Sequence, residues 1–379
     1  MRIAQISPLC ESVPPSLYGG TERIVAHLCD ALVELGHDVT LFACADSVTR
    51  ARLIPVRERP IRLDPSPLKS ELAAHLSMLA EVRERVEDFG ILHFHIDLLH
   101  MPWFTDVAQR SLTTLHGRLD MTDLARAYHL WPHYPLVSIS DQQRKPVPFA
   151  NWLGTVHHGL SPKSYTFNPN QGGYLAFLGR LSPEKRPDRA IAIAKKSGIP
   201  LKIAAKIDAA DKEYFEASIR PQLDHPLVEF IGEIGDHEKS DFLGNAAALL
   251  FPIDWPEPFG LVMIEAMACG TPVIAFRCGS VPEVVDDEVT GFIVETVDDA
   301  VAAVDHLGML DRRRIRAIFE RRFSATAMAK NYVELYQRLL QGDAGTAPYA
   351  PDGFEPETPY TELARARRHR LEPLRGMGT

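Results

Sequence analysis

The stretch Glu257–Gly270, "EPFGLVMIEAMACG", places one carboxylate inside an apolar run and another just ahead of it. Two prolines flank Glu257 and predict an extended segment there, so a helix should begin near Phe259 or Gly260. Glu265 would then lie more than one turn inside this helix. Because glutamate is almost never fully buried without a partner, the partner of Glu265 decides what this segment does.

Two interpretations of the carboxylates are open. In the first, Glu265 accepts two hydrogen bonds from a vicinal diol, as an acidic residue does when it holds a ribose. Glu257 would contact whatever is attached beyond the phosphates, and the amides of Phe259, Gly260 and Leu261 would form an anion-attracting helix N-terminus. In the second, Glu257 caps the helix and Glu265 pairs with a Lys or Arg. A buried charge without any partner is too costly to persist.

On both sides of this segment, short apolar runs alternate with helical patterns. The chain opens with an expected strand at 2–7, a helix at 21–36 and a strand at 38–43. The alternation restarts near residue 174, after a stretch at 161–173 that is rich in Pro, Asn, Ser and Gly. Such successive βαβ units predict an α/β fold with two parallel sheets facing across a cleft. Ligands of such sheets bind at the carboxyl ends of the strands.

Further strands of the first sheet are expected at 90–96, 111–116, 135–140 and 154–159. No element is predicted between residues 44 and 70. Near the end of the chain, Ser324 is the expected N-cap of a helix that runs to Gln341.

The composition is that of a globular protein, with 45% apolar and 24% charged residues among 379. At about 100–200 residues for each domain, the length predicts two domains. A formal net charge of −9 argues against sequence-independent nucleic-acid binding. The five cysteines lack metal-binding spacing, which favours free thiols in the cytoplasm. The first residues show no signal-peptide pattern and no run is long enough to span a membrane, so any membrane contact would be peripheral.

Two cations follow directly after an expected strand of the second half. Arg180 and Lys185 would lie at the cleft, where charge-assisted hydrogen bonds hold a fixed anion such as a diphosphate. The alternative is a solvated loop in which Glu184 and Lys185 form a surface pair that contributes little. This segment alone is equally compatible with both interpretations.

The first half offers two matching features. Gly19 and Gly20 precede a helix, so their amides can approach a phosphate or a sugar oxygen without hindrance from a Cβ atom. The alternative is a plain turn with Thr21 as the N-cap. His116 ends an expected strand at the cleft edge and could donate to a sugar hydroxyl, unless it is satisfied locally.

Several kinds of cofactor and metal site are disfavoured. His93, His95 and Asp97 share one face of a strand, but no further ligand is defined, so we expect an acceptor-facing strand end in place of a metal site. No GxGxxG follows the first strand and no GxxxxGK[ST] occurs, which disfavours nicotinamide, flavin and P-loop sites. Asp-x-Asp is absent as well. Arg180, Lys185 and backbone amides would therefore neutralise a diphosphate without a metal ion.

These segments resemble the retaining glycosyltransferases of family 4, which have the GT-B fold. The resemblance rests on "YGGTERIVAHL", "TLHG", "FLGRLSPEK", "VEFIGEI", "EPFGLVMIEAMACGTPVIAF" and "GSVPEVVDDEVTGFIV", in the family's order, and on the EX7E spacing of Glu257 and Glu265. It implies two Rossmann-like domains, an acceptor-binding one at 1–165 and a donor-binding one at 166–325. A helix at 326–341 would return to the first domain, and the Pro-rich, basic tail at 342–379 would be extended or disordered.

The resemblance also implies roles for individual residues. Arg180 and Lys185 would contact the diphosphate, and Glu265 the ribose. Glu257 would contact sugar hydroxyls, and His116 would lie near the transferred sugar, so that Arg180, Lys185, Glu257 and His116 form the catalytic group. The remaining positions of the donor site, beside the sugar, the phosphates or the base, are Gly19, Gly20, Ile234, Phe259, Gly260 and Leu261.

The implied activity is transfer of a sugar from a nucleoside-diphosphate sugar to a hydroxyl acceptor, with retention at the anomeric carbon and without a metal or cofactor. The acceptor would be a saccharide, a lipid-linked molecule or a small molecule. A sugar-nucleotide epimerase of the same fold and a non-enzymatic nucleotide-sugar binder are the alternatives. One segment departs from the family: "TVHHGLS", at 155–161, replaces a Val-x-Asn-Gly pattern. We expect it to touch the connection between the domains and not the donor site.

Overall fold

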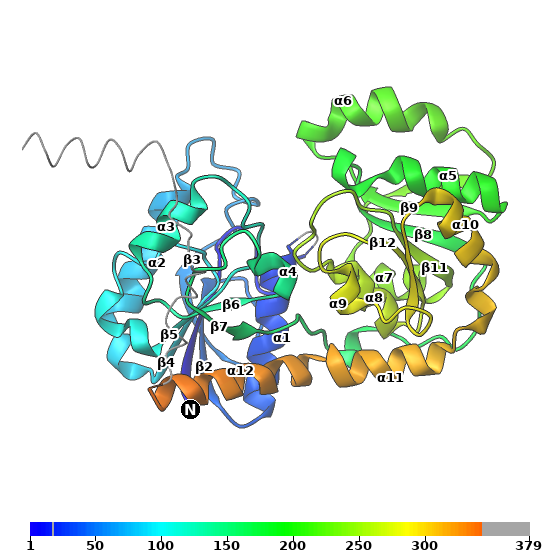
Figure 1. Ribbon diagram of the computed structural model, residues 1–379. Helices are drawn as coiled ribbons and strands as arrows, with labels where there is room; N and C mark the ends of the chain where they lie inside the picture. Colours follow the sequence, from blue (N-terminus) through cyan, green and yellow to red (C-terminus); the bar gives the residue numbers. More distant parts are fainter. Residues whose placement is uncertain (17–18, 343–379) are drawn as a thin grey trace, which may run out of the picture.

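The structure, a computed structural model, describes residues 1–16 and 19–342. Two parallel sheets lie side by side, each covered by helices (Figure 1). The tail expected at 342–379 lies outside the described residues, apart from Gly342.

The first sheet has seven strands in the order β3-β2-β1-β4-β5-β6-β7, and neighbouring strands run parallel. The strands are β1 (Arg2–Ile6), β2 (Asp38–Cys44), β3 (Arg52–Arg57), β4 (Ile91–Phe94), β5 (Ser111–Thr114), β6 (Leu136–Ser138) and β7 (Trp152–Thr155). The helices of this unit are α1 (Gly20–Glu34), α2 (Glu71–Glu84), α3 (Leu124–Leu130) and α4 (Asp141–Arg144). Because helices cover both faces, central strands such as β4 are buried along their whole length.

Two features of this sheet differ from expectation. Strand β3 forms where no element was predicted. It is an edge strand whose residues are exposed or only half buried, and it contains Pro55, which only an edge or a bulge tolerates. The strand expected at 154–159 is β7 at 152–155, so the chain leaves the sheet before His157.

The second sheet has six parallel strands in the order β10-β9-β8-β11-β12-β13. They are β8 (Tyr174–Arg180), β9 (Leu201–Lys206), β10 (Val228–Gly232), β11 (Ala246–Phe251), β12 (Val273–Phe276) and β13 (Gly291–Val294). The helices are α5 (Pro187–Ser197), α6 (Lys212–Tyr214), α7 (Asp236–Gly244), α8 (Leu261–Ala268), α9 (Val281–Val284), α10 (Val297–Asp305) and α11 (Arg312–Arg322). All six residues of β11 are buried, which explains its unbroken apolar sequence "AAALLF".

Within the described residues, the chain crosses between the two units twice, and the crossings pair with each other. Leu160 N donates to Phe323 O at 2.9 Å, and Ala325 N donates to Leu160 O at 2.8 Å. Gly159 allows this approach, because a Cβ atom there would lie 2.4 Å from Ser324 O. The two crossings therefore form one double-stranded connection between the units.

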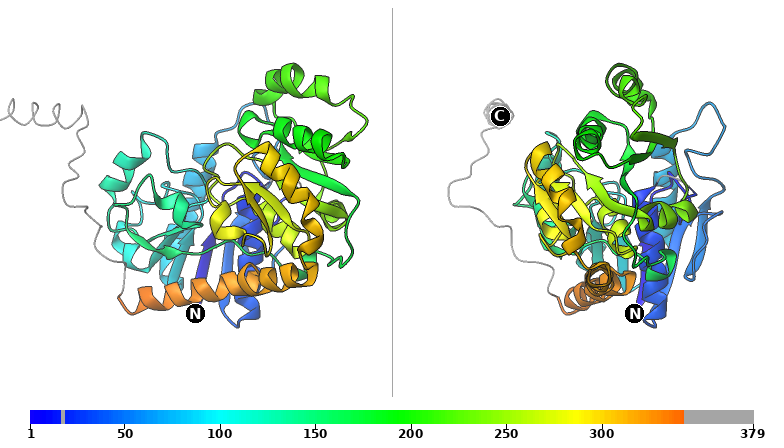
Figure 2. Two further views of the ribbon diagram at one scale, coloured as in Figure 1. Left: turned by 45° about the vertical axis from the view of Figure 1, so that its right-hand side comes forward. Right: turned by 90° about the vertical axis from the view of Figure 1, so that its right-hand side faces the viewer.

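The last described helix, α12 (Ala325–Leu340), begins at the second crossing and lies against the first unit (Figures 1 and 2). It packs on α1. Ser324 is its N-cap, as predicted, and accepts a hydrogen bond from Ala327 N at 3.2 Å. Tyr332 and Tyr336 are fully buried beneath the first sheet. Side chains link the units as well, for example in the ion pair between Arg23 of α1 and Asp236 of α7, at 2.8 Å.

Candidate active site between the two sheets

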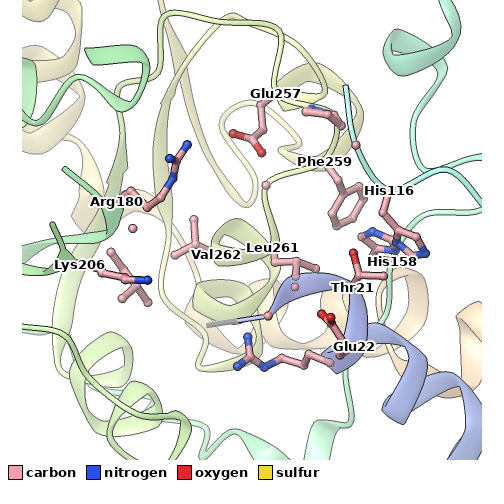
Figure 3. A pocket seen from close by; sticks show the side chains of 18 of the residues that line it. Thr21, Glu22, His116, His158, Arg180, Lys206, Glu257, Phe259, Leu261 and Val262 are labelled. Atoms are coloured by element: carbon pink, nitrogen blue, oxygen red, sulfur yellow. The ribbon is translucent and has the colours of Figure 1, made fainter. Parts of the chain in front are cut away.

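A cavity of about 610 Å³ lies between the two units. This volume falls within the range of about 300–1,000 Å³ that is usual for small-molecule sites. The walls include all the positions singled out as catalytic or donor-binding: Gly19, Gly20, His116, Arg180, Lys185, Ile234, Glu257, Phe259, Gly260, Leu261 and Glu265. Residues far apart in the sequence thus meet in one place (Figure 3), while their individual roles stay predictions.

Glu265 is buried within α8, with 3% of its surface exposed. Its Oε1 accepts hydrogen bonds from Tyr165 Oη and Lys239 Nζ, each at 3.0 Å. Burial alone would raise the pKa of Glu265, but the charges of Lys239 and Arg23 and the hydrogen bonds outweigh it and lower the pKa, so the carboxylate is ionised. Glu265 therefore pairs with a lysine, as the second interpretation expected, and also lines the cavity, as the first required.

Glu257 is held just ahead of α8 by two donors. Its Oε2 accepts from the ammonium group of Lys185 and from the indole N–H of Trp255, the latter at 3.0 Å. The Lys185 ammonium also lies 5.3 Å from the centroid of the Trp255 ring. Gly260 is the N-cap of α8, so the interpretation of Glu257 as a helix cap is wrong.

Two cations end neighbouring strands of the second sheet. Arg180 of β8 and Lys206 of β9 are partners in the strand register, and both side chains line the cavity (Figure 3). Arg180 pairs with Glu184 at 2.8 Å, and Lys206 pairs with Asp208 at 3.0 Å. The alternative of a surface pair between Glu184 and Lys185 is therefore wrong, because each residue has another partner.

Three histidines, His95, His116 and His158, form part of the wall on the side of the first unit. His116 follows β5, and its Nε2 lies 2.9 Å from His95 Nδ1. His158 stacks on His116 with ring centroids 5.2 Å apart, and Phe259 packs edge-on against His158 at 4.9 Å. Burial lowers the pKa of His116 to about 3, so its ring is neutral near pH 7. His158 thus contacts Phe259, just ahead of α8, at the place where the two units meet (Figure 3).

The segment 155–161 lies at the crossing between the units, as expected, and it also reaches the cavity. His158 lines the cavity, whereas His157 turns to Glu283, with 3.3 Å between His157 Nε2 and Glu283 Oε2. The reason is that β7 ends at Thr155, which places both histidines on the crossing between the units.

The starts of α1 and α8 lie against each other, and each of these helices has a glycine as its N-cap. Gly260 has φ 78°, and a Cβ atom there would lie 2.8 Å from the Phe251 ring. Gly19 is the N-cap of α1, so Thr21 is not. A Cβ atom on Gly20 would be in ordinary contact with Leu261, 3.4 Å away, which places the N-terminus of α1 directly opposite that of α8.

Several residues at the cavity were not predicted from the sequence: Lys206, Lys239 and Tyr165. Lys206 had a usable signal, because it directly follows the apolar strand 201–205 beside the strand of Arg180. Nothing in the sequence marks Lys239 or Tyr165, since only the tertiary structure brings them to Glu265. His158 belongs to the segment 155–161, which was not expected at the cavity.

Within residues 1–16 and 19–342, no three His, Cys, Asp or Glu side chains cluster in a way that could hold a metal ion. His95 and Asp97 do line the cavity. The helices of this part of the chain include none with the length and apolar character needed to cross a membrane. All five cysteines are free thiols.

Known families and proteins match both units. Residues 164–319 match Glycosyl transferases group 1, and residues 18–147 match Glycosyltransferase Family 4. A D-inositol 3-phosphate glycosyltransferase of Saccharomonospora viridis is 31% identical over 202 residues, which cover 47% of this chain and 46% of that protein. A phosphatidyl-myo-inositol mannosyltransferase of Mycolicibacterium smegmatis is 25% identical over 86% of this chain and 88% of its own length.

Solved structures agree with this match. AviGT4, a glycosyltransferase involved in avilamycin A biosynthesis, superimposes with a TM-score of 0.71 and 26% identity over 90% of this chain and 98% of its own. Anabaena HepE in complex with UDP and glucose shares the fold, with a TM-score of 0.67 and 17% identity over 89% of this chain and 99% of its own. The chain is thus an enzyme with the GT-B fold that belongs to the family 4 type of group 1 glycosyltransferases.

Proposed function

We propose that this glycosyltransferase moves a sugar from a nucleoside-diphosphate sugar to a hydroxyl acceptor, with retention at the anomeric carbon and without a metal ion. The observation that carries the proposal is the placement of Arg180 and Lys206 beside the N-terminus of α8, with Glu265 and Glu257 lining the same cavity. Cations and helix amides suit a diphosphate, and the carboxylates suit the hydroxyl groups of a ribose and a sugar.

In this proposal the leaving diphosphate receives the growing negative charge of the transition state. Arg180, Lys206 and the amides of Gly260 and Leu261 are fixed in place before reaction, so they stabilise that charge without reorganising. Lys185 is held by Glu257 in this structure. When a donor binds, sugar hydroxyls would donate to Glu257 and free the Lys185 ammonium to contact the diphosphate.

Retention follows in the proposal if the acceptor hydroxyl attacks the face that the leaving group vacates. The alternative of a covalent intermediate on Glu257 is less well supported, because its Oε2 already accepts from Lys185 and from the Trp255 indole. We therefore assign Glu257 to holding the sugar. Domain closure about the paired crossings would exclude water and limit hydrolysis of the donor.

The acceptor would enter from the side of the first unit, where Glu22, Glu71 and Asp97 line the cavity. The relatives named above act on inositol phosphate or phosphatidylinositol by their names, which supports a polyhydroxyl acceptor here. A cytoplasmic location is supported by five free thiols, which a reducing compartment preserves. A match to two glycosyltransferase families does not favour an epimerase or a non-catalytic binder.

The first test is ligand binding to matched variants, with UDP, GDP and ADP compared against inorganic pyrophosphate, which lacks a ribose. We expect Arg180→Ala and Lys206→Ala to weaken binding of both kinds of ligand. Glu265→Gln should weaken the nucleoside diphosphate alone by about tenfold, the effect of one or two charged hydrogen bonds. Glu320→Gln, a change at an exposed carboxylate, is the control.

Turnover provides the decisive measurement. We expect Arg180→Ala and Lys185→Ala to abolish acceptor-dependent release of nucleoside diphosphate, with the wild-type product keeping the donor's anomeric configuration by proton NMR. Activity should persist in the presence of EDTA. Full activity of Arg180→Ala, or isomerisation of a donor without acceptor, would overturn the proposal.

A further inference from the structure

A continuous chain of hydrogen bonds leads from the cavity into the C-terminal helix. His116 Nε2 lies 2.9 Å from His95 Nδ1, and His95 Nε2 lies 2.8 Å from Gln5 Oε1. The other end of the Gln5 side chain, Nε2, donates to Tyr336 Oη at 3.1 Å. Tyr336 Oη in turn lies 2.7 Å from His93 Nδ1. Helix α12 is therefore connected to the cavity through strands β1, β4 and β5.

The series of hydrogen bonds continues beyond His93 to a second tyrosine of α12. His93 Nε2 lies 2.7 Å from Thr114 Oγ1, which lies 2.9 Å from Tyr332 Oη. Gln5, His93, Thr114, Tyr332 and Tyr336 are all fully buried, so none of these groups exchanges its partner for bulk water.

The direction of each hydrogen bond follows from the Gln5 carboxamide. Its oxygen can only accept, so His95 must carry its proton on Nε2. Burial lowers the pKa of His95 well below its ordinary value, so the ring is neutral and its Nδ1 is an acceptor. His116 must then donate from Nε2, which leaves Nδ1 of His116 as a bare acceptor. No described residue donates to this buried Nδ1 atom.

We infer that Gln5 and Tyr336 are positioning residues that act through His95 to hold His116 in a single tautomer, with Nδ1 free to accept a hydrogen bond from substrate. The acceptance of a substrate hydrogen bond by His116 Nδ1 rests on the proposed function of the cavity. The C-terminal helix then has a chemical part in the site in addition to joining the two units.

The Tyr336→Phe variant separates this role from packing. Without the hydroxyl group, the Gln5 amide N–H would lack an acceptor, which costs more in a buried position than a carbonyl oxygen without a donor. The carboxamide should therefore turn over and donate to His95 Nε2. His95 would then carry its proton on Nδ1 and donate to His116 Nε2, which moves the proton of His116 to Nδ1.

The matched control is Tyr332→Phe. It removes the same atom from a tyrosine that is equally buried on the same helix. Tyr332, however, lies at the far end of the series of hydrogen bonds, beyond Thr114. Gln5→Met is a second way to interrupt the series of hydrogen bonds, because it removes the carboxamide from β1 and leaves α12 unchanged. His95 Nε2 would again lose its acceptor and His95 would again donate from Nδ1.

The experiment is nitrogen-15 NMR of the full chain labelled in its histidine rings, with the His116 signals identified by their loss in His116→Gln. We expect a protonated Nε2 and a bare Nδ1 in the wild type and in Tyr332→Phe. Tyr336→Phe and Gln5→Met should both show a protonated Nδ1. An unchanged His116 in both variants, or the same change in Tyr332→Phe, would overturn the inference.

Transfer kinetics then test the link to function separately. We expect kcat to fall by about tenfold in Tyr336→Phe, the rate effect of about one hydrogen bond in the transition state. Tyr332→Phe should stay within about twofold of the wild type, well under the effect of one hydrogen bond. A change of tautomer without any change of kcat would support the positioning of His116 and contradict its proposed part in transfer.

Discussion

Gly260 determines where α8 begins, and with it the direction in which the helix amides point. Its φ of 78° is in the left-handed region, and a methyl group would lie 2.8 Å from the Phe251 ring and 2.9 Å from Met263 Cε. We expect Gly260→Ala to lower the free energy of unfolding by about 1–3 kcal/mol, because strain and overlap act together. Denaturant titration is the measurement.

Gly308→Ala is the control for this substitution, since no atom lies within 4 Å of a Cβ atom at Gly308. Its unfolding free energy should change by no more than about 0.5 kcal/mol. Equal effects of the two variants would show that the backbone at Gly260 is not constrained as described.

Among the elements, α12 carries two functions, because it joins the units and packs beneath the first sheet. Its N-cap lies at the crossing, where Ser324 Oγ accepts from Ala327 N at 3.2 Å. We expect Ser324→Ala to reduce the free energy of unfolding by about 1 kcal/mol, the usual effect of losing an N-cap. Ser324→Thr keeps a capping hydroxyl group and should retain most of the stability in the same denaturation assay. A full loss in Ser324→Thr would indicate packing at the crossing as the cause.

On the scale of the whole molecule, buried histidines predict sensitivity to acid. Burial lowers the pKa of each of them: His93, His95, His100, His116 and His158. The unfolded chain titrates near pH 6.5, so below that pH it binds protons that the folded protein does not. The stability is therefore complete above about pH 6.5 and decreases as the pH falls toward about 3, the pKa of His116.

The measurement is denaturant unfolding between about pH 7.5 and pH 5.5. Each buried histidine should contribute up to about 1.4 kcal/mol for each pH unit at the acid end of this window. We expect His158→Gln to reduce the slope of stability against pH by about that amount. His237→Gln, at a side chain that is 86% exposed, should leave the slope unchanged. A slope of wild-type size in His158→Gln would contradict the prediction.

Much of the fold could be read from local patterns, because a strand covered on both faces needs an unbroken apolar run and a helix needs apolar residues every three or four positions. Strand β3 was not predicted, because an edge strand is only half buried and lacks an unbroken apolar run. The placement of Arg180 and His116 at one cavity could be expected as well, since both lie at the carboxyl ends of parallel strands, where ligands of such sheets bind.

Local patterns do not predict which side chains these residues contact. The sequence by itself determined the two-sheet architecture, the helix that begins directly after Gly260 and the polar residues at the strand ends, because each depends on neighbours within a few positions. Only the tertiary structure decided that Glu265 contacts Lys239 and Tyr165, and that His116 is linked through Gln5 to α12. A hydrogen bond depends on two atoms lying within about 3 Å, and no local pattern encodes that distance for residues of different elements.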